Sequence, residues 1–418
     1  MASLRDEKKE SPIREQRRFA SKAMKIAIVV HGRFHAFDLA RELIGLGHEV
    51  LLLTNYPKRW PEKFGVPAGN VRSLVAHGIL SRAAMALGKA TGNEKLWEPF
   101  LHQWFGRWAV KIIEENPVDA SHTFSGIAEE ILNDARAKQK IRSLVRASSH
   151  ILVQKQILAD EYKRTGINPI GPSEWMIRRE LREYKKADLI ITLSNWCRQT
   201  FLNQGAQEEK VFAIRSGNQL AKFRAPPDIM HERLRRIKNE TSLRVLTTGS
   251  VNSRKGLWDA LEVFANAPAG VEFTWVGEVH PQVRKLLSDK KPNCRFHARV
   301  PQFELKRFYS EADLFMTLSI EEGYAAVIGQ ALASGLPVLA TEHAGVDHIQ
   351  EGKNGWVIPI RRPDLALERL RWIQGNRELF SVIAQNSFKN PGVKDWRQTA
   401  AKLVVTYEEF LSRKKGIG

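Results

Sequence analysis

Residues 312–341 predict a strand, a loop, a helix and a second strand, joined by short connections. The apolar run ADLFMTLS (312–319) predicts a parallel strand buried on both faces. Small apolar residues from 327 to 332 predict a helix that stops at Gly335, and PVLAT (337–341) predicts the next strand. This order favours an α/β fold with a doubly wound parallel sheet.

The same order of elements occurs in both halves of the chain. The first half opens with a strand, helix and strand from MKIAIVVHG to GHEVLLLTN, and the second half opens with a strand, loop and helix at 243–267. Two doubly wound domains facing a cleft therefore form the predicted fold. The predicted divisions are a disordered basic tail (1–23), an N-terminal domain (24–225), a C-terminal domain (226–394) and a terminal helix (395–418). Further predicted strands lie at 119–124, 142–150, 187–194, 210–217, 270–277, 293–300 and 355–360.

Composition limits the class of protein. A length of 418 residues suffices for two domains with full cores. The two cysteines, Cys197 and Cys294, have no metal-ligand spacing and predict a reducing compartment without a disulfide framework. The first 23 residues lack the apolar core of a secretory signal, and no apolar run approaches 18 residues. We therefore expect a cytoplasmic protein.

The chain carries a net charge of +19, and the charge is uneven. Residues 1–225 hold 37 Lys and Arg against 24 Asp and Glu, which gives +13, whereas residues 226–418 hold 28 against 22, which gives +6. An excess of positive charge favours an anionic partner, such as lipid headgroups, nucleic acid or a phosphate-bearing substrate. No nucleic-acid-binding motif accompanies the charge, so we expect no nucleic acid partner. A protein that is basic without functional consequence is the alternative.

The loop between the strand at 312–319 and the following helix carries Glu322 and Gly323. A strand that leads into a helix places free helix N–H groups at the carboxyl edge of the sheet, where anions bind. A carboxylate at that junction would repel a phosphate, so a neutral, hydroxyl-rich group beside the phosphate is the better partner for Glu322. A nucleotide-sugar offers both groups.

This stretch resembles the donor-binding signature of glycosyltransferase family 4, which comprises retaining, nucleotide-sugar-dependent enzymes with the GT-B fold. The family pattern is Glu, seven residues, a second Glu, a small-residue helix and Gly-x-Pro-Val. Glu322 occupies the first position, but Gln330 replaces the second Glu. The resemblance implies that Glu322 lies by the sugar and is catalytic, and that Gln330 faces the nucleotide ribose. It also implies no bound metal or cofactor, with a nucleoside-diphosphate sugar as co-substrate, and a terminal helix that crosses back onto the first domain.

The loop GSVNSRKG (249–256) also joins a strand to a helix. Gly249 allows a tight turn, and Arg254 and Lys255 can neutralise a diphosphate. Lys255 occupies the family's basic position before Gly256, whereas Ser250 stands where many members have a second basic residue. The resemblance extends the predicted donor site to Gly277, Arg299, Val300, Gly323, Tyr324 and the helix-start amides of Ala325, Ala326 and Val327. A simple turn glycine is the alternative for Gly277.

The predicted acceptor site lies in the first half. The loop after the first strand contains His31, Gly32, Arg33 and His35 where many family members have a Gly-Gly pair, so side chains are expected to contact the acceptor. Local capping is the alternative for each. The segment RASSHILVQKQ (146–156) resembles a bacterial branch of the family in which a strand ends at a cleft histidine, here His150, which we therefore predict to be catalytic.

Residues 97–112 place five apolar side chains on one helical face. Burial in the domain core is one interpretation, and a surface at a lipid headgroup boundary is the other. These residues are Trp97, Leu101, Trp104, Trp108 and Ile112.

Taken together, the sequence predicts a retaining glycosyltransferase that moves a sugar from a nucleotide-sugar to a glycan or lipid-linked acceptor, in bacterial surface polysaccharide synthesis. Peripheral binding at the inner face of the cytoplasmic membrane is a further expectation. Two alternatives stay open, a sugar-nucleotide epimerase of the same fold and a non-catalytic sugar-nucleotide-binding protein. A nicotinamide dehydrogenase is disfavoured because neither first strand is followed by GxGxxG.

Overall fold

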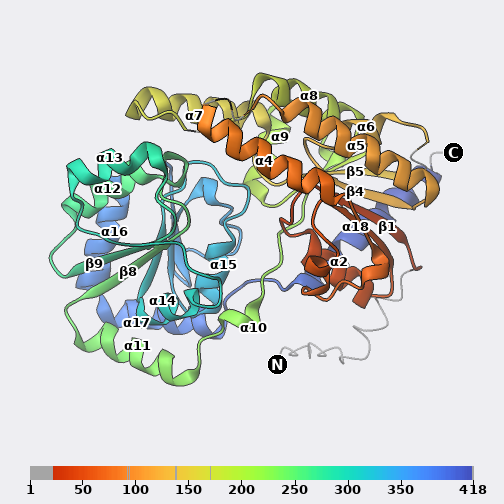
Figure 1. Ribbon diagram of the computed structural model, residues 1–418. Helices are drawn as coiled ribbons and strands as arrows, with labels where there is room; N and C mark the ends of the chain where they lie inside the picture. The colour runs from red at the N-terminus through yellow and green to blue at the C-terminus, as the bar shows by residue number, and fades with distance from the viewer. Residues whose placement is uncertain (1–21, 92, 94, 137–138, 170, 417–418) are drawn as a thin grey trace, which may run out of the picture.

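The structure is a computed structural model that describes residues 22–416 apart from 92, 94, 137–138 and 170. Most of the predicted basic tail (1–23) lies outside the described residues. The rest of the chain forms two parallel β-sheets flanked by helices, one in each half of the chain (Figure 1). The predicted pair of doubly wound α/β domains is thus confirmed.

The first sheet has the strand order β3-β2-β1-β4-β5-β6-β7, and neighbouring strands pair in parallel. Its strands are β1 (Lys25–Val30), β2 (Glu49–Thr54), β3 (Val71–Ser73), β4 (Ala120–Phe124), β5 (Ile141–Arg146), β6 (Leu189–Thr192) and β7 (Val211–Ala213). The helices of this half are α2 (Ala36–Gly45), α3 (Arg59–Glu62), α4 (Val75–Thr91), α5 (Glu98–Glu115), α6 (Glu129–Asn133), α7 (Ile151–Thr165), α8 (Glu174–Lys186), α9 (Asn195–Asn203) and α10 (Leu220–Phe223), with short 3₁₀ turns η1 (Ala68–Asn70) and η2 (Glu208–Lys210).

The second sheet has the order β10-β9-β8-β11-β12-β13 and is also parallel. Its strands are β8 (Leu243–Thr248), β9 (Val271–Val276), β10 (Arg295–His297), β11 (Leu314–Thr317), β12 (Val338–Thr341) and β13 (Gly355–Ile358). The helices are α11 (Pro227–Asn239), α12 (Leu257–Asn266), α13 (Pro281–Lys290), α14 (Leu305–Glu311), α15 (Ala326–Ala333), α16 (Pro363–Gly375), α17 (Arg377–Lys389) and α18 (Trp396–Gly416), with 3₁₀ turns η3 (Ser253–Lys255) and η4 (Glu342–Ala344).

In each sheet the strand order reverses at one point. The reversal falls between β1 and β4 in the first sheet and between β8 and β11 in the second. Loops that follow the two strands at such a switch point diverge to opposite faces and leave a crevice at the carboxyl edge. The sequence loops singled out as functional, 31–35, 249–256 and 318–325, all follow strands that flank these two reversals.

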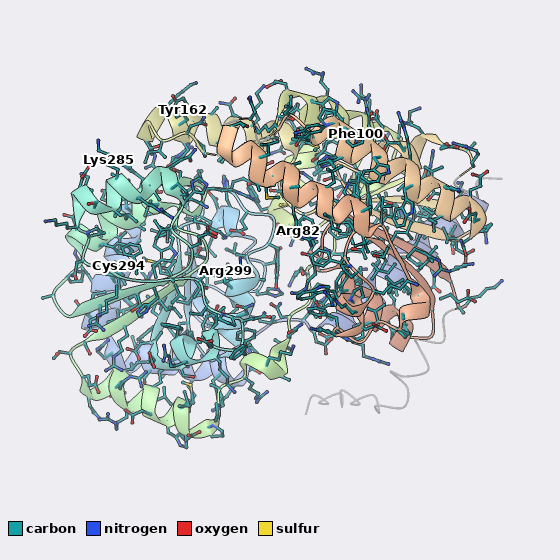
Figure 2. The ribbon with its side chains drawn as sticks, in the orientation of Figure 1. Arg82, Phe100, Tyr162, Lys285, Cys294 and Arg299 are labelled. Atoms are coloured by element: carbon teal, nitrogen blue, oxygen red, sulfur yellow. The ribbon has the colours of Figure 1, made fainter. Side chains whose placement is uncertain are left out.

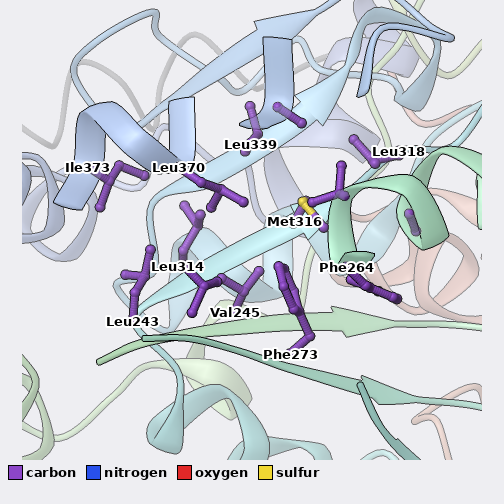
Figure 3. Packing of buried hydrophobic residues seen from close by; sticks show 14 of the residues in the cluster. Leu243, Val245, Phe264, Phe273, Leu314, Met316, Leu318, Leu339, Leu370 and Ile373 are labelled. Atoms are coloured by element: carbon purple, nitrogen blue, oxygen red, sulfur yellow. The ribbon is translucent and has the colours of Figure 1, made fainter. Parts of the chain in front are cut away.

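Buried aliphatic and aromatic side chains fill the space between each sheet and its helices. In the second half, Leu243 and Val245 of β8 pack with Phe273 of β9, Met316 of β11 and Leu370 of α16 (Figure 3). Each such side chain contributes roughly 1.5–3 kcal/mol by leaving water. The continuous apolar runs of the strands are thus explained by burial on both faces of a parallel sheet.

The terminal helix α18 packs on the first domain, as expected for this fold. Its apolar stripe joins the cluster built by β1 and α2, and the Tyr407 hydroxyl lies 2.8 Å from Nδ1 of His122 in β4. The stripe residues recur at helical spacing: Trp396, Ala400, Leu403, Val404 and Tyr407. This helix therefore ties the end of the chain to the domain that begins it.

Ion pairs and close backbone contacts hold the two domains together. Figure 1 shows α7 reaching from the first domain to the edge of the second. There Arg164 of α7 lies 2.6 Å from Asp259 of α12, and Glu161 of α7 lies 3.2 Å from Arg361. Both carboxylates are buried, so these pairs are better shielded from water than surface pairs.

Several strands are shorter in the structure than the sequence predicts, and the one predicted at 210–217 is confined to β7. The strand predicted at 142–150 ends at Arg146, because residues 147–149 bend into the start of α7, and the strand predicted at 293–300 is confined to β10. The Trp-rich face of α5 is mostly turned inward. Leu101 is buried, whereas Trp108 and Ile112 pack against the core cluster and only Trp97 is well exposed. Burial in the core is therefore the better interpretation for most of that face.

Candidate active site

The loops that follow β8 and β11 are pressed together at the switch point of the second sheet. The first loop turns at Gly249, with φ of +123°, and then forms the 3₁₀ turn η3, whose Lys255 N–H is capped by the Asn252 side chain at 3.0 Å. Gly256 has φ of +72°, and a Cβ there would lie 1.8 Å from the Leu318 carbonyl oxygen. Only glycine fits this close approach.

As a result, two adjacent cations face two adjacent carboxylates. Arg254 Nε lies 2.8 Å from Oε2 of Glu321, and Lys255 Nζ forms an ion pair with Oε2 of Glu322. Both Lys255 and Glu322 have partly exposed side chains, so their ion pair is accessible to solvent. The structure thus brings together Arg254, Lys255 and Glu322, which the sequence analysis had assigned to one site.

The sequence patterns predict no role for Glu321. It is fully buried, and its Oε1 accepts hydrogen bonds from the hydroxyls of Ser148 (2.5 Å) and Ser149 (2.8 Å) in the first domain. Although burial by itself would raise the pKa of Glu321, Arg254 and these hydrogen bonds lower it to about 2. The sequence does contain a signal for Glu321. Two adjacent cations, Arg254 and Lys255, stand in one predicted loop, and two adjacent carboxylates, Glu321 and Glu322, stand in the other.

The first turn of α15 was predicted to offer three amides to phosphate. Ala325 does not, because its N–H already donates to the Ala344 carbonyl at 3.0 Å. The prediction for Ala325 is therefore wrong for the structure as described. The N–H groups of Ala326 and Val327, at the first two helical positions, have no hydrogen-bond acceptor among the described residues. These two groups remain available at the positive end of the helix.

A cavity of about 340 Å³ opens between the domains beside this turn. Ala326 and Gln330 of α15 line it from the second domain, together with Tyr324, whose hydroxyl contacts Asn218 and His348. The Gln330 carbonyl oxygen Oε1 accepts one hydrogen bond, from the Tyr309 hydroxyl at 3.0 Å. The second acceptor position of this oxygen and the amide NH₂ have no partner among the described residues.

Close backbone contacts leave no room for a side chain at Gly277 or Gly323. A Cβ on Gly277 would lie 1.9 Å from the Gly249 carbonyl oxygen, so neither a simple turn nor room for a nucleotide is needed to explain this glycine. A Cβ on Gly323 would lie 2.0 Å from the Ala147 carbonyl oxygen of the first domain. Gly323 is therefore where the donor loop touches the other domain.

The remaining predicted donor residues lie farther out. Ser250 is an exposed residue of the first loop, and Arg299 is exposed on the second domain, on the side that faces the first domain in Figure 2. Val300 is half-buried and packs against the cluster around α15. The structure gives these three residues no contact with the paired charges.

The loop after β1 supplies the first-domain wall of the cavity through Arg33 and His35. Gly32, with φ of +109°, is fixed by its N–H bond to the Asn55 side chain at 2.8 Å. Arg33 stacks on the Phe64 ring at 4.0 Å and pairs with Asp38 at 3.7 Å. The buried Nε of Arg33 has no hydrogen-bond partner among the described residues, and neither has the buried Oε1 of Gln219, another residue that lines this cavity.

His31 lies apart from that cavity. Its ring packs against His102 of α5, with centroids 4.9 Å apart, and near His77 of α4. It does not line the cavity that contains Arg33 and His35. The structure therefore separates the His31 side chain from those of Arg33 and His35, and Gly32 does not line the cavity either.

His150 caps α7, where its Nδ1 accepts the N–H of Leu152 at 3.3 Å. The ring packs between Tyr184 and Phe201, and burial together with Arg146 lowers the pKa of His150 to about 4. The imidazole is thus neutral at pH 7, with its proton on Nε2, and it can donate a hydrogen bond there but not act as an acid. Its neighbour Ser149 contacts Glu321 of the second domain, whereas the His150 ring packs on aromatic rings of the first domain.

Neither a metal site nor a membrane span is found in the part of the chain that the structure describes. No group of three or more His, Cys, Asp or Glu side chains is arranged there to hold a metal ion. No helix in that part is both long and apolar enough to cross a membrane.

Burial of neutral histidines predicts an acid-sensitive fold. The pKa values of His31, His35 and His150 are lowered to about 4, chiefly by burial. Between pH 6.5 and 4 the unfolded chain binds protons that the folded chain does not, so each such histidine lowers the free energy of unfolding by about 1.4 kcal/mol per pH unit as pH falls. Urea unfolding should therefore show clearly lower stability at pH 5 than at pH 7.

The variant His35→Asn supplies the control, because it removes one titrating group and should flatten this pH dependence. Equal stability of the unsubstituted protein at pH 5 and pH 7 would contradict the buried, neutral state of these histidines.

Comparison with known proteins agrees with this geometry. Residues 242–375, which carry both loops of the paired charges, match the family model "Glycosyl transferases group 1". The amylovoran biosynthesis glycosyltransferase AmsK of Erwinia amylovora is 27% identical over 218 residues, which cover 48% of this chain and 51% of AmsK. The chain spans about half the length of the curated relatives it matches.

Solved structures resemble nearly the whole chain. Sucrose-phosphate synthase from Thermosynechococcus elongatus superposes with a TM-score of 0.70 at 16% identity, covering 93% of this chain and 100% of that one. Alr3699/HepE of Anabaena, solved in complex with UDP, gives 0.65 at 14% identity and covers 93% and 100%. The chain therefore has the GT-B glycosyltransferase fold, with a second domain similar to the group 1 glycosyl transferases.

Proposed function

We propose that this protein is a retaining, metal-independent glycosyltransferase that moves a sugar from a nucleoside-diphosphate sugar to a glycan or lipid-linked acceptor. The observation that carries the proposal is the convergence of Lys255, Glu322 and the free amides of Ala326 and Val327 at one switch point. Cations and helix-start amides suit a diphosphate, and the adjacent carboxylate suits a sugar.

In the proposed reaction, the bond between the anomeric carbon and the diphosphate oxygen breaks, and the acceptor hydroxyl oxygen bonds to that carbon. The hydroxyl proton passes to the departing diphosphate. Lys255, Arg254 and the amides of α15 stabilise the negative charge that develops on the leaving group. Glu322 stabilises the positive charge that develops on the sugar, and the His150 Nε2–H donates a hydrogen bond to the sugar. The retaining outcome is proposed from the resemblance of the donor motif to family 4.

The ion pair between Lys255 and Glu322 has a consequence for donor binding. In the structure the charges of Lys255 and Glu322 neutralise each other. A diphosphate must draw Lys255 toward itself, which frees the Glu322 carboxylate to face the sugar. The two charges thereby separate only when the donor supplies a partner for each.

The names of relatives support the proposed setting. AmsK is named for amylovoran biosynthesis, and WcaL of Salmonella typhimurium for putative colanic acid biosynthesis. Alr3699/HepE has been solved with UDP-glucose. We extend these to a nucleotide-sugar donor and to bacterial surface polysaccharide synthesis for this chain.

Substitution of Lys255 tests the donor assignment. Lys255→Ala should weaken nucleoside diphosphate binding about ten- to a hundredfold, since a hydrogen bond to a charged group contributes roughly 1.5–3 kcal/mol. Titration calorimetry with UDP and GDP gives the affinities. Lys285→Ala removes the same charge from an exposed position on α13 of the same domain and should leave binding unchanged (Figure 2). Equal affinity in the Lys255 variant and the unsubstituted protein would contradict the assignment.

We also propose that the first domain binds anionic membranes peripherally, which would give access to a lipid-linked acceptor. The exposed apolar side chains gather on α4 and the start of α5 rather than on the Trp-rich face. Ile79, Met85 and Leu87 are 63%, 56% and 54% exposed, and Phe100 is 52% exposed. Residues 64–93 contain no Asp or Glu. An exposed apolar helix without acidic residues fits the surface of an anionic bilayer.

Vesicle sedimentation checks this membrane proposal. The protein should pellet with vesicles that contain phosphatidylglycerol, and high salt should release part of it by screening the basic charges. Ile79→Ser combined with Leu87→Ser should lower binding severalfold, because both remove apolar contact with the acyl chains. The control, Leu379→Ser, removes an equally exposed leucine from α17 in the second domain. Full recovery of the unsubstituted protein in the supernatant at low salt would rule the proposal out.

A further inference from the structure

Glu321 precedes Glu322 in the loop after β11 and has no role in the transfer reaction proposed above. It is fully buried at the boundary between the domains. On the side of the first domain its carboxylate accepts four hydrogen bonds: from the Ser148 hydroxyl (2.5 Å), the Ser149 N–H (3.2 Å), the Ser149 hydroxyl (2.8 Å) and the Gln154 side-chain amide (3.0 Å). These groups all belong to the bend after β5 and the first turn of α7.

On the side of the second domain, Glu321 holds Arg254. The guanidinium Nε lies 2.8 Å from the Glu321 carboxylate and donates to the Glu321 backbone carbonyl at 2.9 Å, while Nη2 reaches the Ser148 hydroxyl at 3.3 Å. Nη1 has no partner among the described residues, and the side chain is 38% exposed. Arg254 is therefore fixed along one edge, and its other edge is open to solvent next to Lys255 in the sequence.

The orientation of Gln154 is itself determined by the first domain. Its carbonyl oxygen accepts a hydrogen bond from Arg146 Nη2 at 2.8 Å, and Arg146 is paired with the buried Glu180 at 3.1 Å. Only the amide NH₂ of Gln154 can then face Glu321. A continuous polar chain thus runs from Glu180 in α8 across the domain boundary to Arg254.

This arrangement is satisfied only while the domains are in contact. If they separated, Glu321 would lose its four partners in the first domain and keep Arg254 alone. A buried carboxylate is costly without hydrogen-bond partners, so these bonds favour the docked state over a separated state in which the first-domain groups must be hydrated again. The close contact of Gly323 with Ala147, two residues away, depends on the same docking.

We propose that Glu321 is a positioning residue, which docks the donor loop on the first domain and aims the free edge of Arg254 at the diphosphate. The docking half of this inference stands independently, whereas the Arg254 half rests on the proposed function. Glu321 acts through Arg254 and does not itself contact the donor. The contact that docks the two domains is therefore the same contact that orients Arg254.

Hydrogen–deuterium exchange on the ligand-free, full-length protein tests the docking half. Glu321→Gln should speed amide exchange at 148–154 by about tenfold, since the Ser149 N–H loses its charged acceptor. Gln154→Ala removes a partner from the first domain and should have an effect in the same direction. The double variant should resemble the single variants, because both break one contact. Glu342→Gln removes a carboxylate from an exposed position on the adjacent loop and is the matched control.

Calorimetric titration with UDP tests the Arg254 half. Without Glu321, Arg254 must be ordered when the nucleotide binds, and immobilising one long side chain weakens binding roughly two- to tenfold. In protein that retains Arg254, Glu321→Gln should therefore weaken UDP binding by that factor. In the Arg254→Ala variant, adding Glu321→Gln should weaken UDP binding no further. A generally destabilised fold would weaken binding in both backgrounds.

The outcomes separate the two halves. Exchange at 148–154 that is equal in the Glu321→Gln and Glu342→Gln variants would overturn docking. If the unsubstituted protein binds UDP and Glu321→Gln binds it equally well, the positioning of Arg254 is overturned. No UDP binding by the unsubstituted protein would contradict a uridine-nucleotide donor and with it the role of Arg254 toward UDP, while the exchange result would still decide docking.

Discussion

Two neighbouring cations face two neighbouring carboxylates where the second sheet reverses its strand order, and the rest of the functional architecture depends on this arrangement. It requires β8 and β11 to be adjacent, since their loops carry the opposite charges. It also requires Gly256, because any side chain there would collide with the Leu318 carbonyl and push the loops apart. The fold thus brings together charges that lie about seventy residues apart in the sequence.

The two ion pairs differ in burial, and this difference divides their roles. Lys255 and Glu322 both have partly exposed side chains, so a ligand can reach their ion pair from solvent. Glu321 is inaccessible and fully hydrogen-bonded, so its pair with Arg254 is part of the framework. One pair belongs to the proposed chemistry and the other to the geometry that prepares for it. A like-charged doublet in a loop can therefore serve two different purposes within one site.

The sequence predicted the sheets well, because parallel strands buried on both faces appear in the sequence as continuous apolar runs, such as 25–30 and 314–317.

The sequence also predicted that Arg254, Lys255 and Glu322 share one site, since the motif and the strand–loop–helix pattern place them at the same sheet edge. The sequence did not predict the role of Glu321. Two of the residues that Glu321 contacts in the first domain, Ser148 and Ser149, lie in a bend where the sequence predicted that the strand continues. Nor did it predict that the Ala325 amide is occupied, that the Gln330 carbonyl already has a donor, or that His31 turns toward α5. Each of these depends on a contact between segments distant in the sequence, which local pattern does not encode.

In the proposed reaction the donor frees Glu322 from Lys255, and Glu322 then supports sugar transfer. Turnover of a panel of nucleotide-sugars, with a cell-derived glycan and lipid fraction as acceptor, measures this directly as acceptor-dependent release of nucleoside diphosphate. We expect turnover by the unsubstituted protein and measurable turnover in Gln330→Glu. Glu322→Gln should lose at least about a hundredfold in turnover, as expected for removal of an electrostatic group at the reacting centre. Full turnover by Glu322→Gln on the same substrate pair would contradict the proposed role of Glu322.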